Sequence, residues 1–502
     1  MTTQEALKIY REKTEQLHAL GHAMGVLSYD GATAAPAESA EGRGKTLAYL
    51  SGCAYEIETS PEMLEAANWL NAHKEELNQQ DRREIQVFLR ENEFTAAIPK
   101  EEYVAYVELL NKADAVWHKA KQDSDFASFA PIVKDIFATN VRFDKYYKPD
   151  RAPYDTQLDR YEKGLTMEKT DAFFNALKER IVPLLKKVMA KPQVDDSFIW
   201  GKVYPTEAQR KFSDYLMDVI TIDRKRCSIG ETEHPFTTNF NKKDVRITTH
   251  YHEETPVYSM YSVIHEGGHA LYELHTADSL EGTILAGGVS MSIHESQSRF
   301  MENIIGRSRA FIELIFPKMQ ELFPEQLKGV TAEQMYRAVN KAEPSLIRTE
   351  ADELTYALHV LVRYEIEKGL FDGSIAVEDL PKIWNAKYKE YLGIDVPDDK
   401  RGVLQDSHWS FGAFGYFPSY ALGSAYGAQF LAKMKETVDV DAALAKGDFS
   451  AINAWNKEYI WHYGSLLTPA EILQNTFGAP FDPTYYLDYL EAKCKDVYGF
   501  KK

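Results

Sequence analysis

With 502 residues, 44% of them apolar, the chain has no apolar run long enough to span a bilayer, and its charged, amphipathic N-terminus is unlike a signal peptide. A net charge of −18 argues against nucleic acid or an anionic membrane as a partner. The three cysteines are far apart and odd in number, which argues against a disulfide framework, so we expect a cytoplasmic protein.

Helical patterns dominate the N-terminal half of the chain. Helices are expected over residues 61–77, 99–122 and 166–190. Ser60 provides an N-cap for the first, and Pro183 is expected to kink the last. Thr206 and Gln209 predict a capping box at the start of a further helix. Because no repeat or Gly/Ser linker interrupts the chain, we expect residues 1–502 to form one mostly α-helical domain, with two lobes flanking a groove.

One stretch breaks the helical pattern. Residues 234–256 are rich in Thr, Val, Ile, Phe and Tyr and contain the polar turn "NKKD", which predicts a β-hairpin. The edge of such a hairpin could pair with an extended peptide, or the hairpin could simply cover the next helix. We favour the first of these two interpretations.

Directly after the hairpin, the sequence "HEGGH" places His265 and His269 four residues apart on a predicted helix. Residues at this spacing share one helix face, so both imidazoles can bind one metal ion. Glu266 is one step round the helix, where its carboxylate can take a proton from a water on that ion. Gly267 and Gly268 weaken a helix, which suggests that another segment passes close to the backbone. The pattern predicts a zinc-type hydrolase site, against the alternative of a coincidental buried helix.

A catalytic zinc usually has a third protein ligand, and residues 290–306 offer three candidates. Glu295 is the expected ligand, on a second helix that faces the first. Glu302 is seven residues further on and shares that face, so it fits a hydrogen-bond partner of a ligand histidine. His294 points about 100° away on a helix and is expected to line the cleft instead.

Six motifs occur in order along the chain. They are "HPF" at 234–236, "DVRIT" at 244–248, "HEGGH" at 265–269, "HESQS" at 294–298, "IRTEAD" at 347–352 and "GVLQDSHW" at 402–409. In these motifs the chain resembles the carboxypeptidase Taq family of gluzincin metallocarboxypeptidases, also called thermostable carboxypeptidase 1. The resemblance implies a mostly helical fold similar to neurolysin and angiotensin-converting enzyme, with a deep groove and a small β-hairpin or sheet beside the HExxH helix.

The family removes C-terminal residues from peptides with broad specificity, depends on zinc, which cobalt often replaces, and is usually homodimeric. The resemblance therefore implies a metallocarboxypeptidase that binds one Zn²⁺ ion per chain through His265, His269 and Glu295. It also implies that Glu266 is the general base that activates the metal-bound water. The expected partners are peptides with a free C-terminus and a second copy of the chain.

A carboxypeptidase must bind a free α-carboxylate, and guanidinium groups hold carboxylates with two hydrogen bonds. Arg348 and Arg246 are the first candidates, and Arg401 is a weaker third. The alternative is that these arginines pair with their own acidic neighbours. His234 is expected to join the catalytic residues by adding a hydrogen bond to the substrate carboxylate or backbone.

The oxyanion of the tetrahedral intermediate needs a hydrogen-bond donor besides the metal. Residues 410–427 are rich in glycine and aromatic residues, and we interpret them as a flexible loop whose tyrosines swing towards the substrate. Tyr420 is the preferred donor, with Tyr416 and His408 next. Asp406 is expected to orient His408 or a ligand histidine. The alternative for each tyrosine is aromatic packing under a loop.

Two rival functions stay open. An oligoendopeptidase similar to neurolysin would share the metal site but lack the carboxylate clamp. A metal-stabilised binding protein without catalysis is less favoured, because a purely structural site has no use for the carboxylate of Glu266.

Overall fold

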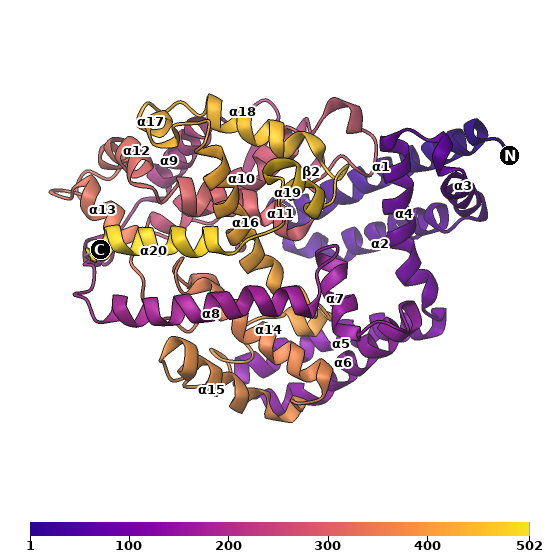
Figure 1. The fold of residues 1–502 in the computed structure, drawn as a ribbon, viewed down its shortest axis with the longest axis horizontal. Coiled ribbons are helices and arrows are strands. Elements are labelled where there is room, and N and C mark those ends of the chain that lie inside the picture. Colours follow the sequence, from indigo (N-terminus) through magenta and orange to yellow (C-terminus); the bar gives the residue numbers. More distant parts are fainter. Residues whose placement is uncertain (501–502) are drawn as a thin grey trace.

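The structure, a computed structural model, describes residues 1–500, and most of them are helical, as predicted (Figure 1). The helices before the sheet are α1 (Thr3–Thr33), α2 (Ala40–Glu58), α3 (Pro61–Ala72), α4 (Gln79–Ala97), α5 (Lys100–Asp123), α6 (Phe126–Tyr147), α7 (Pro153–Tyr161), α8 (Met167–Met189) and α9 (Thr206–Val219). The helices after the sheet are α10 (Val257–Leu274), α11 (Met291–Arg299), α12 (Arg309–Leu322), α13 (Ala332–Val339), α14 (Tyr356–Asp372), α15 (Leu380–Leu392), α16 (Pro418–Met434), α17 (Val440–Ala445), α18 (Ser450–Tyr459), α19 (Pro469–Phe477) and α20 (Thr484–Tyr498). A π-helical segment, Phe300–Ile305, directly follows α11.

Side-chain caps explain where two of the predicted helices begin. The Ser60 hydroxyl accepts a backbone N–H of α3, and the Thr166 hydroxyl does the same for α8. α8 continues through Pro183 as one helix. α3 ends at Ala72, earlier than predicted, and a short 3₁₀ turn replaces its last expected residues.

The predicted capping box at Thr206 is wrong. Thr206 is already the first residue of α9, one position too late to act as its N-cap, and its side chain caps no backbone N–H. Gln209 donates instead to the backbone carbonyls of Tyr204 and His252. These bonds tie α9 to the segment that leads into α10.

Three short strands form a sheet against α10: β1 (Cys227–Glu231), β2 (Thr237–Asn241) and β3 (Asp244–Thr249). β3 lies in the middle, antiparallel to β2 and parallel to β1. The predicted hairpin is confirmed as β2 and β3, although β3 ends at Thr249, and β1 was not predicted. β2 is an edge strand whose side chains contact α10 on one face and α1 on the other.

Residues 418–434 form helix α16, so the predicted flexible loop is wrong in this part. Pro418 occupies the first turn, where a helix tolerates proline. Gly423 and Gly427 face α11: a Cβ at Gly423 would lie 2.7 Å from the Cβ of Glu295. The glycines therefore allow two helices to pack closely, and they do not indicate a mobile segment.

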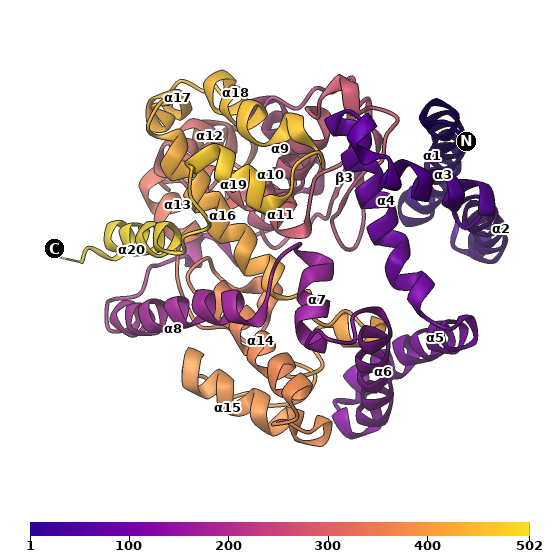
Figure 2. The same ribbon diagram turned by 45° about the vertical axis from the view of Figure 1, so that its right-hand side comes forward.

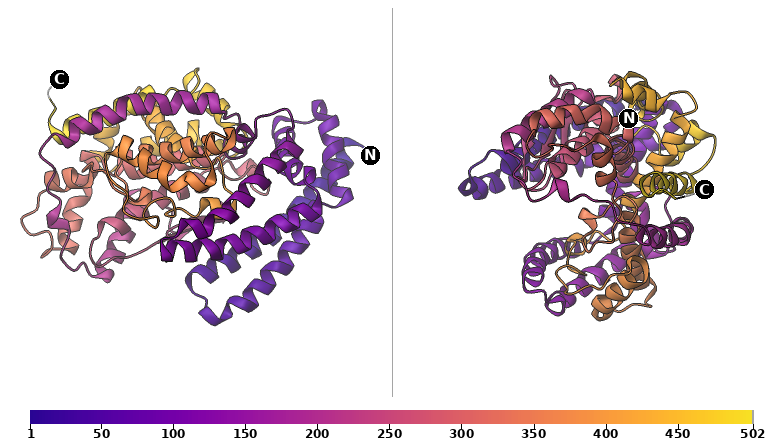
Figure 3. Two further views of the ribbon diagram at one scale, coloured as in Figure 1. Left: turned by 90° about the horizontal axis from the view of Figure 1, so that it is seen from below. Right: turned by 90° about the vertical axis from the view of Figure 1, so that its left-hand side faces the viewer.

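Buried apolar side chains form two clusters within residues 1–500. The larger extends from Ala113 to Tyr498, and the smaller joins α1, α3 and α4 through residues such as Tyr10 and Phe88. These N-terminal helices lie at the end of the molecule opposite the C-terminus, and α1 and α2 run side by side (Figures 1 and 3). Figure 2 shows α10, α11 and α16 in the upper part of the molecule and α14 and α15 in the lower part. The division into two lobes of one domain stays a prediction.

Within the part of the chain that the structure describes, no helix has both the length and the apolar character that a bilayer crossing requires.

Candidate active site

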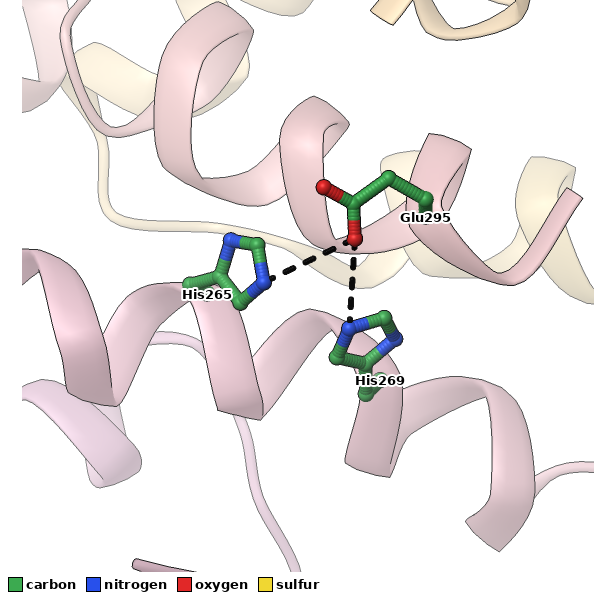
Figure 4. Close-up of side chains that lie close together, drawn as sticks. All are labelled: His265, His269 and Glu295. Atoms are coloured by element: carbon green, nitrogen blue, oxygen red, sulfur yellow. Dashed lines mark ion pairs between the residues drawn. The ribbon is translucent and has the colours of Figure 1, made fainter. Parts of the chain in front are cut away.

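The three predicted metal ligands lie together between α10 and α11 (Figure 4). His265 Nε2 is 3.7 Å from Glu295 Oε2, and His269 Nε2 is 3.6 Å from the same oxygen. All three donor atoms fall within 4.8 Å of one another. Three donors that bind one zinc ion tetrahedrally at about 2.1 Å lie roughly 3.4 Å apart. The group therefore fits one divalent ion with three protein ligands.

The two glycines of "HEGGH" allow close packing on two sides of α10: Gly268 faces α11, and Gly267 faces Ile220 at the end of α9. A Cβ at Gly268 would lie 2.5 Å from the backbone oxygen of Gln297 and 2.7 Å from the Cα of Ser298. A Cβ at Gly267 would meet the side chain of Ile220 at 2.4 Å. The prediction that another segment passes close to this backbone is confirmed: the segment is α11, which carries Glu295.

Each imidazole has a partner on the ring nitrogen that faces away from Glu295. His265 Nδ1 lies 2.8 Å from Glu302 Oε2, which matches the partner role predicted for that carboxylate. His269 Nδ1 lies 2.6 Å from Nδ1 of His294. His294 Nε2 in turn lies 2.6 Å from Glu273 Oε1. Partners of this kind fix the orientation of ligand histidines.

Two arginines hold the carboxylates of this site. Arg299 Nε donates to Glu295 Oε1 at 2.7 Å, and its Nη1 donates to Glu302 Oε2 at 3.3 Å. Burial alone would raise the pKa of Glu295, but the charges of Arg299 and His265 hold that pKa well below its ordinary value. Arg299, His265 and Arg307 likewise outweigh burial at Glu302 and lower its pKa to about 2. Both carboxylates are therefore ionised at neutral pH.

Glu266 lines a cavity of about 340 Å³ beside the three ligands. Burial raises its pKa above the ordinary value of 4.5. The Thr237 hydroxyl of β2 lies 2.5 Å from Glu266 Oε2, and a hydrogen bond from it partly counteracts this rise. A buried carboxylate with a raised pKa next to a metal site suits a general base.

The aromatic residues predicted near the substrate gather on one wall of this cavity. Tyr416 and Tyr420 both line it. The Tyr420 hydroxyl lies 3.1 Å from Nε2 of His408, which is itself buried and stacks on Tyr416. Burial and the charges of Arg348 and Arg363 lower the pKa of His408 to about 3, so its imidazole is neutral at neutral pH.

Arg348 lies behind this wall, with its guanidinium 4.6 Å from the Tyr420 ring centre. Its Nε and Nη2 donate to Asp406 at 3.1 and 2.8 Å, and its Nη1 contacts the Tyr356 hydroxyl at 3.3 Å. Asp406 also accepts from Arg363 at 2.7 Å. The hydrogen bonds of Asp406 thus go to two arginines, and not to His408 or a ligand histidine as predicted.

Three other predicted substrate residues lie outside the set that lines the cavity. Arg246 pairs with Asp244 at 2.8 Å, and its guanidinium lies over Tyr29 of α1, on the sheet face turned away from α10. Arg401 is exposed and pairs with Asp398 at 2.9 Å. His234 is exposed, but the next residues of its motif, 235 and 236, do line the cavity.

Sequence reasoning missed four residues that hold the site in place: Arg299, Thr237, Glu273 and Arg363. Local spacing could have indicated two of them. Arg299 is four residues after Glu295 and three before Glu302, and Glu273 is four residues after His269, so each pair shares a helix face. Thr237 and Arg363 reach the site through tertiary contacts that no local pattern reports.

A family model described as carboxypeptidase Taq (M32) metallopeptidase matches residues 9–494. The chain is 39% identical to Carboxypeptidase 1 of Bacillus subtilis (strain 168), with 98% of each chain covered. It is 36% identical to Thermostable carboxypeptidase 1 of Thermus thermophilus, with 99% of each covered. Its fold matches the crystal structure of M32 carboxypeptidase from Deinococcus radiodurans R1 with a TM-score of 0.95 at 34% identity, covering 99% of this chain and 100% of that one.

The match extends along nearly the whole chain, and it includes both helices that carry the His-His-Glu group. The likeness in fold and sequence agrees with a site that fits a divalent metal next to a buried carboxylate. The chain belongs to the carboxypeptidase Taq (M32) family of metallopeptidases and is a peptide hydrolase.

Proposed function

We propose that the protein hydrolyses the C-terminal peptide bond of peptides with broad specificity and that Glu266 is its general base. One observation carries this proposal: the carboxylate of Glu266 lines the same cavity as two of the proposed metal ligands, His269 and Glu295, and the aromatic side chain of Tyr420. A scissile bond in this cavity would have a metal, a base and a hydroxyl donor around it.

The residues of the cavity divide the chemistry between them. A divalent ion held by the three ligands would polarise the scissile carbonyl and the attacking water. Glu266 takes the proton of this water and passes it to the leaving amine. Tyr420 donates a hydrogen bond to the developing oxyanion, with Tyr416 as the second candidate. His408 contacts the Tyr420 hydroxyl and orients it.

Arg348 is the proposed anchor of the substrate's α-carboxylate. Its guanidinium is held rigidly by Asp406 through Nε and Nη2, whereas its Nη1 contacts only the neutral hydroxyl of Tyr356. A carboxylate that replaced this hydroxyl would gain a charge-assisted hydrogen bond. Arg348 does not line the cavity itself, but its guanidinium lies against the ring of Tyr420, which does. Arg246 and His234 are weaker candidates, because Arg246 lies over Tyr29 of α1 and His234 is exposed.

Zinc is the proposed ion, one per chain, because two imidazoles and a carboxylate with an open position are its usual catalytic ligands. Co²⁺ accepts the same donors and is the proposed substitute. We also propose a cytoplasmic homodimer. The three cysteines, all within the described residues, are free, which suits a reducing compartment. None of the residues of α2, all of them described, is buried, and its Tyr49 is 73% exposed, so a second copy could cover this helix.

An oligoendopeptidase is the second candidate, since Arg348 and Arg246 are each already paired with an aspartate. N-blocked dipeptides with varied C-terminal residues decide between the two, each assayed as the free acid and as the amide, with and without a chelator. We expect hydrolysis of the free acids, almost none of the amides, and loss of activity on chelation. Equal hydrolysis of acid and amide would establish the endopeptidase.

A further inference from the structure

Hydrogen bonds link His269, the second histidine of the proposed metal site, through His294 to Glu273. Glu273 is one turn beyond His269 on α10, and His294 bridges the two side chains. The distances are 2.6 Å from His269 Nδ1 to His294 Nδ1 and 2.6 Å from His294 Nε2 to Glu273 Oε1. Asn239 of β2 donates to Glu273 Oε2 at 2.8 Å and closes the chain.

We propose that Glu273 and His294 are positioning residues that hold His269 in the tautomer protonated at Nδ1, so that the lone pair of its Nε2 faces the metal. This inference rests on the metal site of the proposed function. It states which atom donates in each of these hydrogen bonds. It also assigns a role to Glu273 and His294, which are not among the proposed metal ligands.

The donors around Glu273 set the direction of its bond with His294, and the proposal extends this direction to His269. Its Oε1 accepts the backbone N–H of Gly288 at 3.1 Å, and its Oε2 accepts the Asn239 amide. Both oxygens therefore act as acceptors, so His294 donates from Nε2. A neutral imidazole then has its lone pair on Nδ1, which accepts the Nδ1–H of His269. If His294 donated to His269 instead, His269 would carry its proton on Nε2, the nitrogen that faces the other two proposed ligands.

The ring of His294 is closely packed by Gly288 and Tyr272. A Cβ at Gly288 would lie 2.5 Å from His294 Cδ2 and 2.9 Å from a ring carbon of Tyr272. The Tyr272 ring packs against the imidazole with the two ring centres 5.1 Å apart. Glu273 is 5% exposed. Side chains held in this way cannot easily exchange partners with solvent, which suits a fixed tautomer.

The two metal-binding imidazoles are thus held differently. His265 contacts the carboxylate of Glu302 directly, whereas His269 reaches a carboxylate only through a second ring. Loss of His294 should free the His269 ring to rotate or change tautomer, while the bond between His265 and Glu302 is unaffected. The effect should therefore appear in metal affinity more than in the stability of the metal-free fold.

The first test needs no variant. In full-length protein labelled with ¹⁵N-histidine and loaded with Zn²⁺, NMR should show His269 protonated at Nδ1 and His294 protonated at Nε2 alone. A His269 protonated at Nε2, or a His294 protonated on both nitrogens, would overturn the proposal. A wild-type protein that takes up no Zn²⁺ would overturn both this proposal and the proposed function. A protein that binds Zn²⁺ but shows the other protonation pattern would overturn this proposal alone.

The second test measures Zn²⁺ affinity by chelator competition. His294→Leu should raise the dissociation constant about 10- to 100-fold, whereas the Tm of the metal-free protein should fall only slightly. Glu273→Gln should give a smaller loss, because its amide oxygen can still accept from His294. His275→Leu, which removes an imidazole at the end of the same helix, is the matched control and should bind Zn²⁺ like wild type. Unchanged affinity in His294→Leu would exclude the proposed role.

Discussion

Arg299 and Glu295 are one turn apart on α11, and the 2.7 Å bond from Arg299 Nε to Glu295 Oε1 leaves the other carboxylate oxygen facing the two imidazoles. The arginine thus selects which oxygen of the proposed ligand Glu295 faces the metal position. It also places a positive charge beside two buried carboxylates, because it contacts Glu302 as well.

Arg299→Met should therefore weaken both the fold and the metal site. Removing the cation leaves the buried Glu295 without an arginine partner and Glu302 with Arg307 alone, and breaking a buried ion pair costs about 3–5 kcal/mol. Urea unfolding and Zn²⁺ titration measure the two effects. Arg299→Lys keeps the charge without the planar fork and should fall between wild type and Met. A Met variant that is as stable as wild type would contradict this account.

Glu266→Gln should abolish most hydrolysis and keep the metal. The amide fills the same space but cannot accept a proton, so kcat should fall about 10²- to 10⁴-fold. Steady-state kinetics and metal analysis of the same sample measure this. If the variant hydrolysed peptides at the wild-type rate, another group would have to be the base.

Thr237→Val should move the acidic limb of the kcat/KM profile to higher pH. Burial already raises the pKa of Glu266, and the Thr237 hydroxyl partly lowers it again. Without that hydrogen bond the pKa rises further, so the base becomes protonated, and activity is lost, at a higher pH. Thr238→Val, on the other face of β2, is the control and should leave the limb in place. Identical profiles for the two variants would refute the role of Thr237.

Chelation of the metal should lower the Tm. Carboxylates outnumber guanidinium groups around the site. The carboxylates are Glu266, Glu273, Glu295 and Glu302, and the guanidinium groups that contact them are those of Arg299 and Arg307. A divalent cation balances this excess, and an ion at 100 times its dissociation constant stabilises the fold by about 2.7 kcal/mol. Thermal melts with chelator, then with added Zn²⁺, test this. Mg²⁺, which prefers oxygen ligands, should not restore the Tm.

Gly268→Ala should destabilise the fold by about 1–3 kcal/mol and reduce activity, because its methyl group would meet the backbone of α11, which cannot move aside. Gly21→Ala is the matched control: it is also helical, has no atom within 4 Å of the new methyl, and should stabilise α1 by about 0.5–1 kcal/mol. Denaturant midpoints of the two variants should shift in opposite directions. A Gly268→Ala protein with wild-type stability would mean that α10 and α11 pack less closely.

The sequence was sufficient to predict the His-His-Glu group because its information is local. The spacing of His265 and His269 defines one helix face, and the seven-residue step from Glu295 to Glu302 defines another. The hairpin was likewise readable from its composition and turn. Each of these patterns needs only a few neighbouring residues.

Tertiary pairing explains what could not be predicted. Arg348 and Asp406 are 58 residues apart, and only the fold shows that they bind each other. β1 joins the sheet by parallel pairing to β3, which leaves no hairpin pattern. The glycines of α16 were misinterpreted because close helix packing and loop flexibility favour the same residue. The position of Arg246 follows from the alternation of side chains along a strand. Ile247 pairs with Thr237, which faces α10, so the neighbouring Arg246 faces the other side of the sheet.

Thr237 and Asn239 are same-face neighbours on β2, and their side chains support Glu266 and Glu273 on α10. One short strand thus aligns both the proposed general base, Glu266, and Glu273, which we propose positions His269. A backbone shift of that strand would disturb the two together, and only side-chain substitution can uncouple them. If both proposals hold, proton transfer and metal binding depend on the position of the same strand.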